Sequence, residues 1–205
     1  NLAFYANYAG DFQTGEQQAR TVQEPDAYAT LALAFAQLGQ GQLPQAIETY
    51  QKLATIDAGQ SVAASGLGDL ATFEGRFSDA VRILERGAAE DLTSRNVDRA
   101  AEKFAALAYT QILRGQKSDA SAAAQQALAN SRAVKVRFLA ARTFVETGEL
   151  TRARPLMTGL GLEPQSEPQA YAKIVEAEIN LGTKDVRRAI KLLTDANGLL
   201  DTWIG

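Results

Sequence analysis

Apolar residues recur along this chain at the three- and four-residue intervals that one face of an α-helix requires. Ala46, Ile47, Tyr50 and Leu53 form one such run, and a glycine and a short polar turn separate it from the run before. Each run therefore predicts an amphipathic helix. No stretch shows the sustained alternation of apolar and polar residues that a half-buried strand needs. The pattern predicts an all-α protein built from successive helices.

Six glycines divide these runs at intervals of 29 to 40 residues. Glycine adopts the left-handed conformation at little steric cost, so each is predicted to cap the C-terminal end of a helix. Ser78 and Ser118, each followed by an aspartate, then begin the next helix with a capping side chain. Helix, glycine turn and second helix together form a hairpin. The six glycines are Gly10, Gly39, Gly75, Gly115, Gly148 and Gly182.

The hairpin is repeated along the chain. Residues 24–29 recur almost unchanged at 167–172, an offset of 143 residues, which corresponds to four units of about 36. We expect a single array over 1–205, with longer turns after Gly39 and Gly182 and a long connection at 92–100. The hairpins are predicted to span 1–24, 25–58, 59–97, 98–132, 133–165 and 166–198, and 199–205 to begin a truncated further unit.

Small residues stand where the two helices of a hairpin would cross, which lets their backbones approach. The clearest unit has Leu67 and Gly68 in its first helix, Gly75 in its turn and Ala80 in its second helix. This arrangement resembles the tetratricopeptide repeat family over essentially the whole chain. The resemblance implies a right-handed α-solenoid of about six stacked antiparallel helical hairpins. It also implies a non-enzymatic protein–protein interaction scaffold, here a fragment of a larger bacterial protein.

Two residue types that carry much of enzyme chemistry, cysteine and histidine, do not occur in the sequence. Disulfides, thiolate or imidazole metal ligands and a Ser-His-Asp arrangement are therefore excluded. Residues 66–71 match a dinucleotide-binding spacing, but such a site needs a preceding strand, and residues 61–65 favour helix. We interpret Gly66 and Gly68 as helix-crossing positions and expect no catalytic residue, no cofactor and no metal.

Charge is spread unevenly over a chain whose formal net charge is −3. Residues 1–66 hold six acidic and two basic residues, whereas 132–205 hold nine acidic and eleven basic ones. The densest basic stretch, 132–154, keeps open an alternative function as an RNA-binding helical repeat. The negative overall charge makes nucleic acid an unfavourable partner.

A second alternative is a structural self-assembly segment of a larger signalling protein, in which the open ends of the array stack on another copy. No apolar run approaches the roughly 18 residues of a membrane helix, so membrane insertion of this segment is not expected. A chain without cysteine fits either a reducing cytoplasm or a bacterial periplasm.

The resemblance places the partner-binding surface in a concave groove lined by the first helix of each hairpin, where a peptide or another domain of the same polypeptide would bind. Aromatic anchors and arginine are residues that such surfaces use. Lys135 and Arg142 lack the asparagines of the cluster with which some family members grip a chaperone's carboxylates. The groove residues expected from the helical register are Asp69, Phe73, Tyr109, Lys135, Phe138, Arg142, Glu146 and Glu176.

Overall fold

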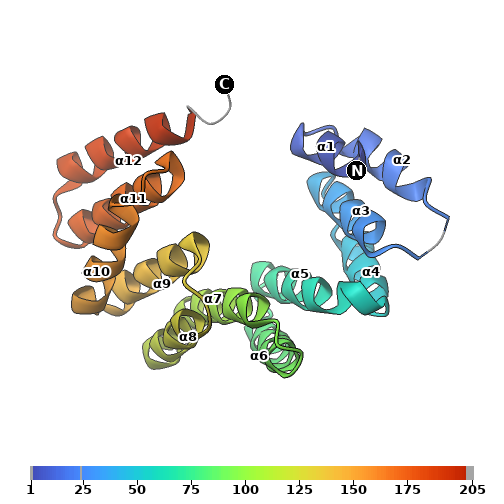
Figure 1. Cartoon of the computed structure of the whole chain (residues 1–205), viewed down its shortest axis with the longest axis horizontal. Coiled ribbons are helices and arrows are strands. Elements are labelled where there is room, and N and C mark those ends of the chain that lie inside the picture. Colours follow the sequence, from blue (N-terminus) through green and yellow to red (C-terminus); the bar gives the residue numbers. More distant parts are fainter. Residues whose placement is uncertain (1, 24, 202–205) are drawn as a thin grey trace. The chain divides into compact units, whose positions relative to one another are not determined.

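The computed structural model describes residues 2–23 and 25–201, and every element in this part of the chain is a helix (Figure 1). The all-α prediction is confirmed, and successive α-helices pair into six antiparallel hairpins. The elements are α1 (Leu2–Tyr8), α2 (Phe12–Arg20), α3 (Ala27–Gly39), α4 (Leu43–Leu53), η1 (Asp57–Gly59), α5 (Gln60–Phe73), α6 (Phe77–Thr93), α7 (Val97–Leu113), α8 (Lys117–Asn130), α9 (Val134–Thr147), α10 (Leu150–Gly161), α11 (Ser166–Gly182) and α12 (Val186–Asp201).

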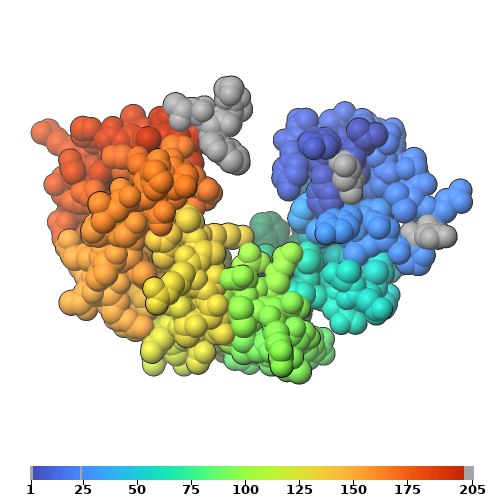
Figure 2. Space-filling view, in the orientation of Figure 1, coloured from blue at the N-terminus to red at the C-terminus, as the bar shows by residue number. Residues whose placement is uncertain are grey.

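The chain forms two compact units, a first unit over Asn1–Asp91 and a second unit over Leu92–Gly205, where the sequence predicted one continuous array. In the first unit α1 packs against α3, and α4 packs against both α3 and α5. In the second unit α7 packs against α9, and α9 packs against α11. Helix α8 contacts both α7 and α9, and α10 contacts both α9 and α11. The helices α9 to α12, yellow to red in Figure 2, form one continuous body. Stacking of hairpins through their first helices is the packing of an α-solenoid.

The left-handed turn residue is not always the glycine that the sequence pattern marks. Gly39 and Gly182 lie in the last turns of α3 and α11, and the left-handed residues are Gly41 (φ 73°) and Lys184 (φ 64°). Gly39 is needed for packing instead, because a Cβ there would overlap the ring of Phe12. The glycines that have positive φ as predicted are Gly10, Gly75, Gly115 and Gly148.

This correction makes the turns uniform. The turns after Gly39 and Gly182 were expected to be longer, but in each hairpin turn below a fully buried alanine follows the left-handed residue at the same interval. The pairs are Gly41 and Ala46, Gly75 and Ala80, Gly115 and Ala120, Gly148 and Ala153, and Lys184 and Ala189.

The connection predicted to be long at residues 92–100 is short. Helix α6 continues to Thr93 and α7 begins at Val97, so residues 94–96 alone connect them. Arg95 takes the left-handed conformation (φ 61°), as the glycines do in the hairpin turns. The polar residues that indicated a loop are instead the exposed ends of two helices of 17 residues each.

The further unit that was expected to start at residue 199 falls only partly on residues that the structure describes. Residues 199–201 continue α12, which runs through Asn197 and Gly198 without a break. Residues 202–205, on which the rest of this prediction falls, lie outside the described residues, as does Glu24 at the end of the first predicted unit.

Gly66 and Gly68 both lie inside α5, where neighbouring helices approach closely. A Cβ on Gly66 would overlap the ring of Tyr50 in α4, and a Cβ on Gly68 would overlap the side chain of Leu84 in α6. Both Tyr50 and Leu84 are buried. The helix-crossing interpretation of these glycines is confirmed, since neither stands at a strand-to-helix turn.

Among the helices described, none combines the length and the apolar character that crossing a membrane demands.

Candidate protein interface

A pocket of about 220 Å³ lies between the first helices α7 and α9 of the second unit. Ile112, Leu113 and Leu139 give it apolar walls. Three of the predicted groove residues, Tyr109, Arg142 and Glu146, line the same pocket. They meet because positions three and four apart share one helix face, and the two helices lie side by side. The tyrosine leaves 56% of its surface exposed, so it is available to a partner.

Arg142 is held in place by contacts with the next first helix, α11. Its Nε donates to Oε1 of Glu178 at 2.7 Å, and its guanidinium lies 5.6 Å from the centre of the Phe138 ring. Phe138 in turn stacks on Tyr171, with ring centres 4.1 Å apart and an interplanar angle of 8°. The Tyr171 hydroxyl donates to Oε1 of Glu167 at 2.7 Å. One edge of the pocket is therefore rigid before any ligand arrives.

Glu178 is the residue of this surface that the groove prediction missed. Its side chain is only 18% exposed, and its Oε2 has no hydrogen-bond partner within the described part of the chain. Burial raises the pKa of the Glu178 carboxyl, Arg142 partly offsets this, and the nearby charge of Glu146 raises it further. When a carboxylate is buried and only one of its oxygens accepts a hydrogen bond, its ionised form is destabilised relative to its protonated form.

This raised pKa predicts a pH-dependent contribution to stability. The folded state holds the Glu178 proton more tightly than the unfolded state, so the contribution is complete below the ordinary pKa of 4.5 and is lost as the pH rises through the folded pKa. Urea unfolding at a series of pH values should show that the free energy of unfolding of the wild type falls as the pH rises above 4.5. In Glu178→Gln this fall should be absent, because glutamine does not ionise.

Glu149 offers a control of opposite sign. Hydrogen bonds from Ser121 and Arg152 lower the pKa of the Glu149 carboxyl, so its contribution is present at neutral pH and is lost as the pH falls through the lowered value. Glu149→Gln should therefore change the free energy of unfolding at acidic pH in a pH-dependent way, and should leave its pH dependence above pH 4.5 unchanged. Identical profiles for the wild type and Glu178→Gln above pH 4.5 would contradict the burial argument.

The remaining predicted groove residues do not join the pocket between α7 and α9. Lys135 is exposed in the first turn of α9, and Glu176 pairs with Arg188 of α12 at 3.0 Å. Asp69 and Phe73 belong to α5 of the first unit, where Phe73 is 76% exposed. Asp69 is exposed too, and burial together with the charge of Asp69 raises the pKa of Tyr50.

Three of the six basic residues in the stretch at 132–154 form ion pairs within the second unit. Arg137 pairs with Glu163 at 2.7 Å and Arg142 with Glu178 at 2.7 Å. Arg152 pairs with Glu149 at 2.8 Å, donates to Ser121, and lies 4.0 Å from the ring centre of Phe144. These arginines hold helices together, which weakens the case for a phosphate-binding surface.

A second pocket on first helices lies between α1 and α3 of the first unit, and none of the eight groove residues named above lines it. Its volume is about 620 Å³, and exposed tyrosines stand at its rim. The sequence does contain a pattern that indicates this pocket. Phe4 and Tyr8 are four residues apart, and so are Leu31 and Phe35, so each pair lies on one face of its own helix. The pocket is lined by Phe4, Tyr8, Asp26, Tyr28, Leu31 and Phe35.

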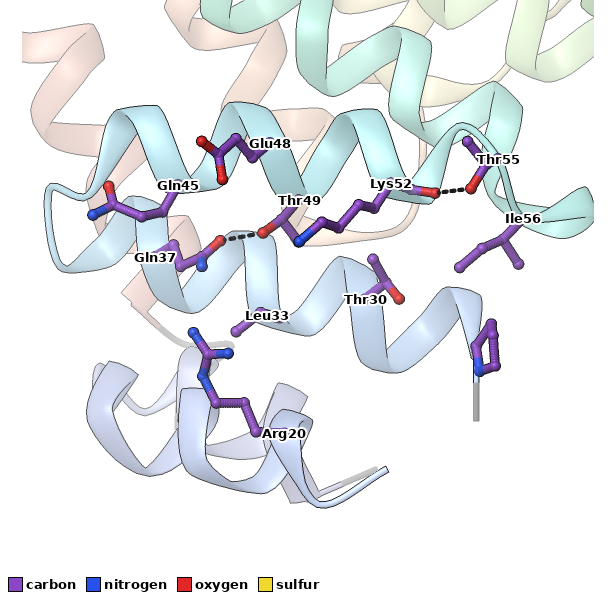
Figure 3. Close-up of a pocket in the computed structure, with 11 residues that line it drawn as sticks. Arg20, Thr30, Leu33, Gln37, Gln45, Glu48, Thr49, Lys52, Thr55 and Ile56 are labelled. Atoms are coloured by element: carbon purple, nitrogen blue, oxygen red, sulfur yellow. Dashed lines mark hydrogen bonds between the residues drawn. The ribbon is translucent and has the colours of Figure 1, made fainter. Parts of the chain in front are cut away.

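A third pocket, of about 450 Å³, faces the second helices α2 and α4 and has α3 as its floor (Figure 3). Figure 3 shows the Arg20 side chain extending from α2 toward Leu33 of α3. Gln37 and Thr49 join α3 to α4 through a buried hydrogen bond of 2.7 Å. Many of the residues that line this pocket are polar, but most of its lining surface is apolar. The bond from Thr49 to Gln37 stabilises the hairpin.

Part of the chain is similar to a known repeat family. Residues 37–104 match a family model described as tetratricopeptide repeat. The structure of YrrB, "a TPR protein with an unusual peptide-binding site", is 16% identical, with 92% of this chain and 91% of that chain covered and a TM-score of 0.50. A tetratricopeptide repeat protein from Parabacteroides merdae is 14% identical over 97% of this chain and 90% of that chain, with a TM-score of 0.42. No curated protein matches the sequence.

Proposed function

We propose that this chain belongs to the tetratricopeptide repeat family and is a non-enzymatic scaffold, which binds a peptide or partner domain along the first helices of its second unit. Helical-hairpin repeats of this kind offer extended surfaces for binding. A chain without cysteine and histidine also lacks the residues on which many hydrolytic mechanisms depend.

The observation that carries the proposal is the pocket between α7 and α9. It joins an exposed tyrosine, apolar walls and charges of both signs at its rim, Arg142 and Glu146. A buried apolar contact surrounded by polar groups is the usual arrangement of an interface anchor. The stacked rings of Phe138 and Tyr171 hold Arg142 in place, so a ligand would meet a preformed edge.

The size of this pocket favours a side chain as its occupant. A volume of about 220 Å³ accommodates one large apolar side chain and leaves the tyrosine and the two rim charges to contact the flanking backbone. A peptide-binding site is described for YrrB, and we propose the same class of ligand here.

The proposal predicts that Tyr109→Ala weakens peptide binding by about tenfold or more, because an aromatic anchor typically contributes more than about 1.4 kcal/mol. A library of random twelve-residue peptides would be selected on the wild-type chain, and the enriched peptides measured by isothermal titration calorimetry against the wild type and the variant.

Tyr5→Ala is the matched control. Tyr5 is 73% exposed on α1 of the first unit and does not line the pocket, so its loss should change the affinity by less than about twofold. Failure to enrich any peptide, or enriched peptides that bind Tyr109→Ala as well as they bind the wild type, would refute the proposed binding surface.

The RNA-binding alternative has less support. Arg137, Arg142 and Arg152 are committed to ion pairs with carboxylates, which neutralise much of the charge on which this alternative depended.

A further inference from the structure

We propose that the pocket between α1 and α3 is a second binding site, which takes an arginine or lysine side chain of a basic peptide segment. The inference extends the proposed scaffold function to a different surface and names the chemistry of its ligand. It is argued from three observations: the geometry of the aromatic rings, the position of a carboxylate, and the separation of charge within the first unit.

Four of the six residues that line this pocket are aromatic, and two of these four are exposed tyrosines. Phe4 stacks near Tyr8 with ring centres 6.3 Å apart, and Phe4 and Phe35 form a T-shaped pair with ring centres 5.8 Å apart. Tyr8 and Tyr28 are 80% and 68% exposed at the rim. The faces of aromatic rings are negative, so they attract a cation placed within about 6 Å of the ring centre.

The chain already uses this contact elsewhere. Arg142 lies 5.6 Å from the ring centre of Phe138, and Arg152 lies 4.0 Å from that of Phe144. In the second unit, therefore, arginines of the chain itself occupy aromatic faces. In the pocket between α1 and α3 the residues that line it include no arginine or lysine.

A carboxylate stands beside these rings. Asp26 caps the N-terminus of α3, where its Oδ1 accepts from the Ala29 backbone N–H at 2.7 Å. Its side chain also lines the pocket and is exposed. A carboxylate has two oxygens and accepts several hydrogen bonds, so Asp26 can pair with an incoming cation while it caps the helix.

The charge of the first unit strengthens this preference. Residues 1–91 contain twelve acidic and five basic residues, a net charge of −7. Two of the five basic residues, Arg20 and Lys52, line the third pocket, which faces α2 and α4. That pocket lies on the other side of α3 from the aromatic rings. The remaining three, Arg76, Arg82 and Arg86, pair with carboxylates on or near α6. A basic ligand is therefore attracted to the unit, and no basic residue of the unit competes for the pocket.

The pocket is also large enough for this ligand. Its volume of about 620 Å³ exceeds that of an arginine side chain, and Leu31 adds an apolar wall for the methylene groups of that side chain. An acidic segment would meet a negative carboxylate and negative ring faces. These contacts select for cations.

The test uses three fluorescein-labelled octapeptides that differ at two positions only. One carries two arginines and two leucines among glycines, and in the other two both arginines are replaced by glutamine or by glutamate. Fluorescence anisotropy with the full chain should give at least about tenfold tighter binding of the arginine peptide than of the glutamate peptide. Added salt should weaken the arginine peptide most.

Two variants locate the contact. Tyr28→Ala should weaken binding of the arginine peptide by roughly threefold to tenfold, since it removes one ring face. Asp26→Asn should weaken it similarly, and because asparagine caps a helix as well as aspartate does, folding is preserved. Tyr109→Ala, on the pocket between α7 and α9, should leave this affinity within about twofold.

Each other outcome overturns the inference. Equal binding of the three peptides, or unchanged binding to Tyr28→Ala, would show that the pocket does not select cations. Loss of binding with Tyr109→Ala alone would place the peptide on the other pocket, which refutes this inference but leaves the proposed function standing. No peptide binding, together with a dimer in sedimentation that Tyr28→Ala dissociates, would show that a second copy occupies the pocket.

Discussion

Replacing Phe144 by alanine is expected to lower the free energy of unfolding of the second unit by about 3–5 kcal/mol. Phe144 is 1% exposed in α9, and its ring lies 4.0 Å below the guanidinium of Arg152. The substitution removes a large buried side chain and leaves a cavity among helices that cannot close it fully. Urea unfolding followed by circular dichroism measures the change.

Phe73→Ala is the matched control for this substitution. Phe73 is 76% exposed at the end of α5, so the same chemical change should alter the free energy of unfolding by less than about 0.5 kcal/mol. Comparable destabilisation by the two variants would contradict the assignment of Phe144 to the core. Phe73 would then need a buried contact that its exposure excludes.

Gly66→Ala is expected to destabilise the first unit by about 1–3 kcal/mol, although alanine is the better helix former. The added Cβ would overlap the ring of Tyr50, which is 2% exposed and has little room to move. The gain in helix propensity, about 1 kcal/mol, offsets only part of this cost. Thermal and urea unfolding both report the difference.

Gly198→Ala in α12 separates helix propensity from packing. Gly198 is also helical, but nothing lies within 4 Å of the position that a Cβ would take. Alanine should therefore stabilise the second unit by about 0.5–1 kcal/mol. If Gly66→Ala were stabilising as well, close contact with Tyr50 would not be the reason for glycine in α5.

Helical periodicity was sufficient to predict the elements and part of the candidate site. Tyr109, Arg142 and Glu146 follow from it, because a residue's face on a straight helix depends only on its position, and α7 and α9 pack side by side. The hairpin prediction succeeded for the same reason. Residues that stand three or four positions apart in the sequence lie on the same face of the helix in the structure.

What the sequence did not predict depends on contacts between helices. Glu178 and Arg188, the partners of Arg142 and Glu176, lie on other helices, and spacing within one helix does not locate them. Lys103 is only 1% exposed, whereas its charge would predict a position on the surface.

Turn chemistry was the other source of error. Arg95 and Lys184 take the left-handed conformation that was expected of glycine, so the search for glycines misplaced two connections. Gly39 was taken for a turn residue, whereas its role is to admit the ring of Phe12. A glycine in a sequence indicates that space is limited or that φ is positive, and only the neighbouring helix decides which applies.

Photo-crosslinking from position 109 tests most directly whether partners contact the first helices of the second unit. Tyr109→benzoylphenylalanine would be irradiated in lysate of the cells that make the protein, beside Leu193→benzoylphenylalanine on the second helix α12, where Leu193 is 43% exposed. Adducts that form from position 109 and not from position 193 are the predicted result. Adducts of equal yield from both positions, or from position 193 alone, would contradict a binding surface on the first helices.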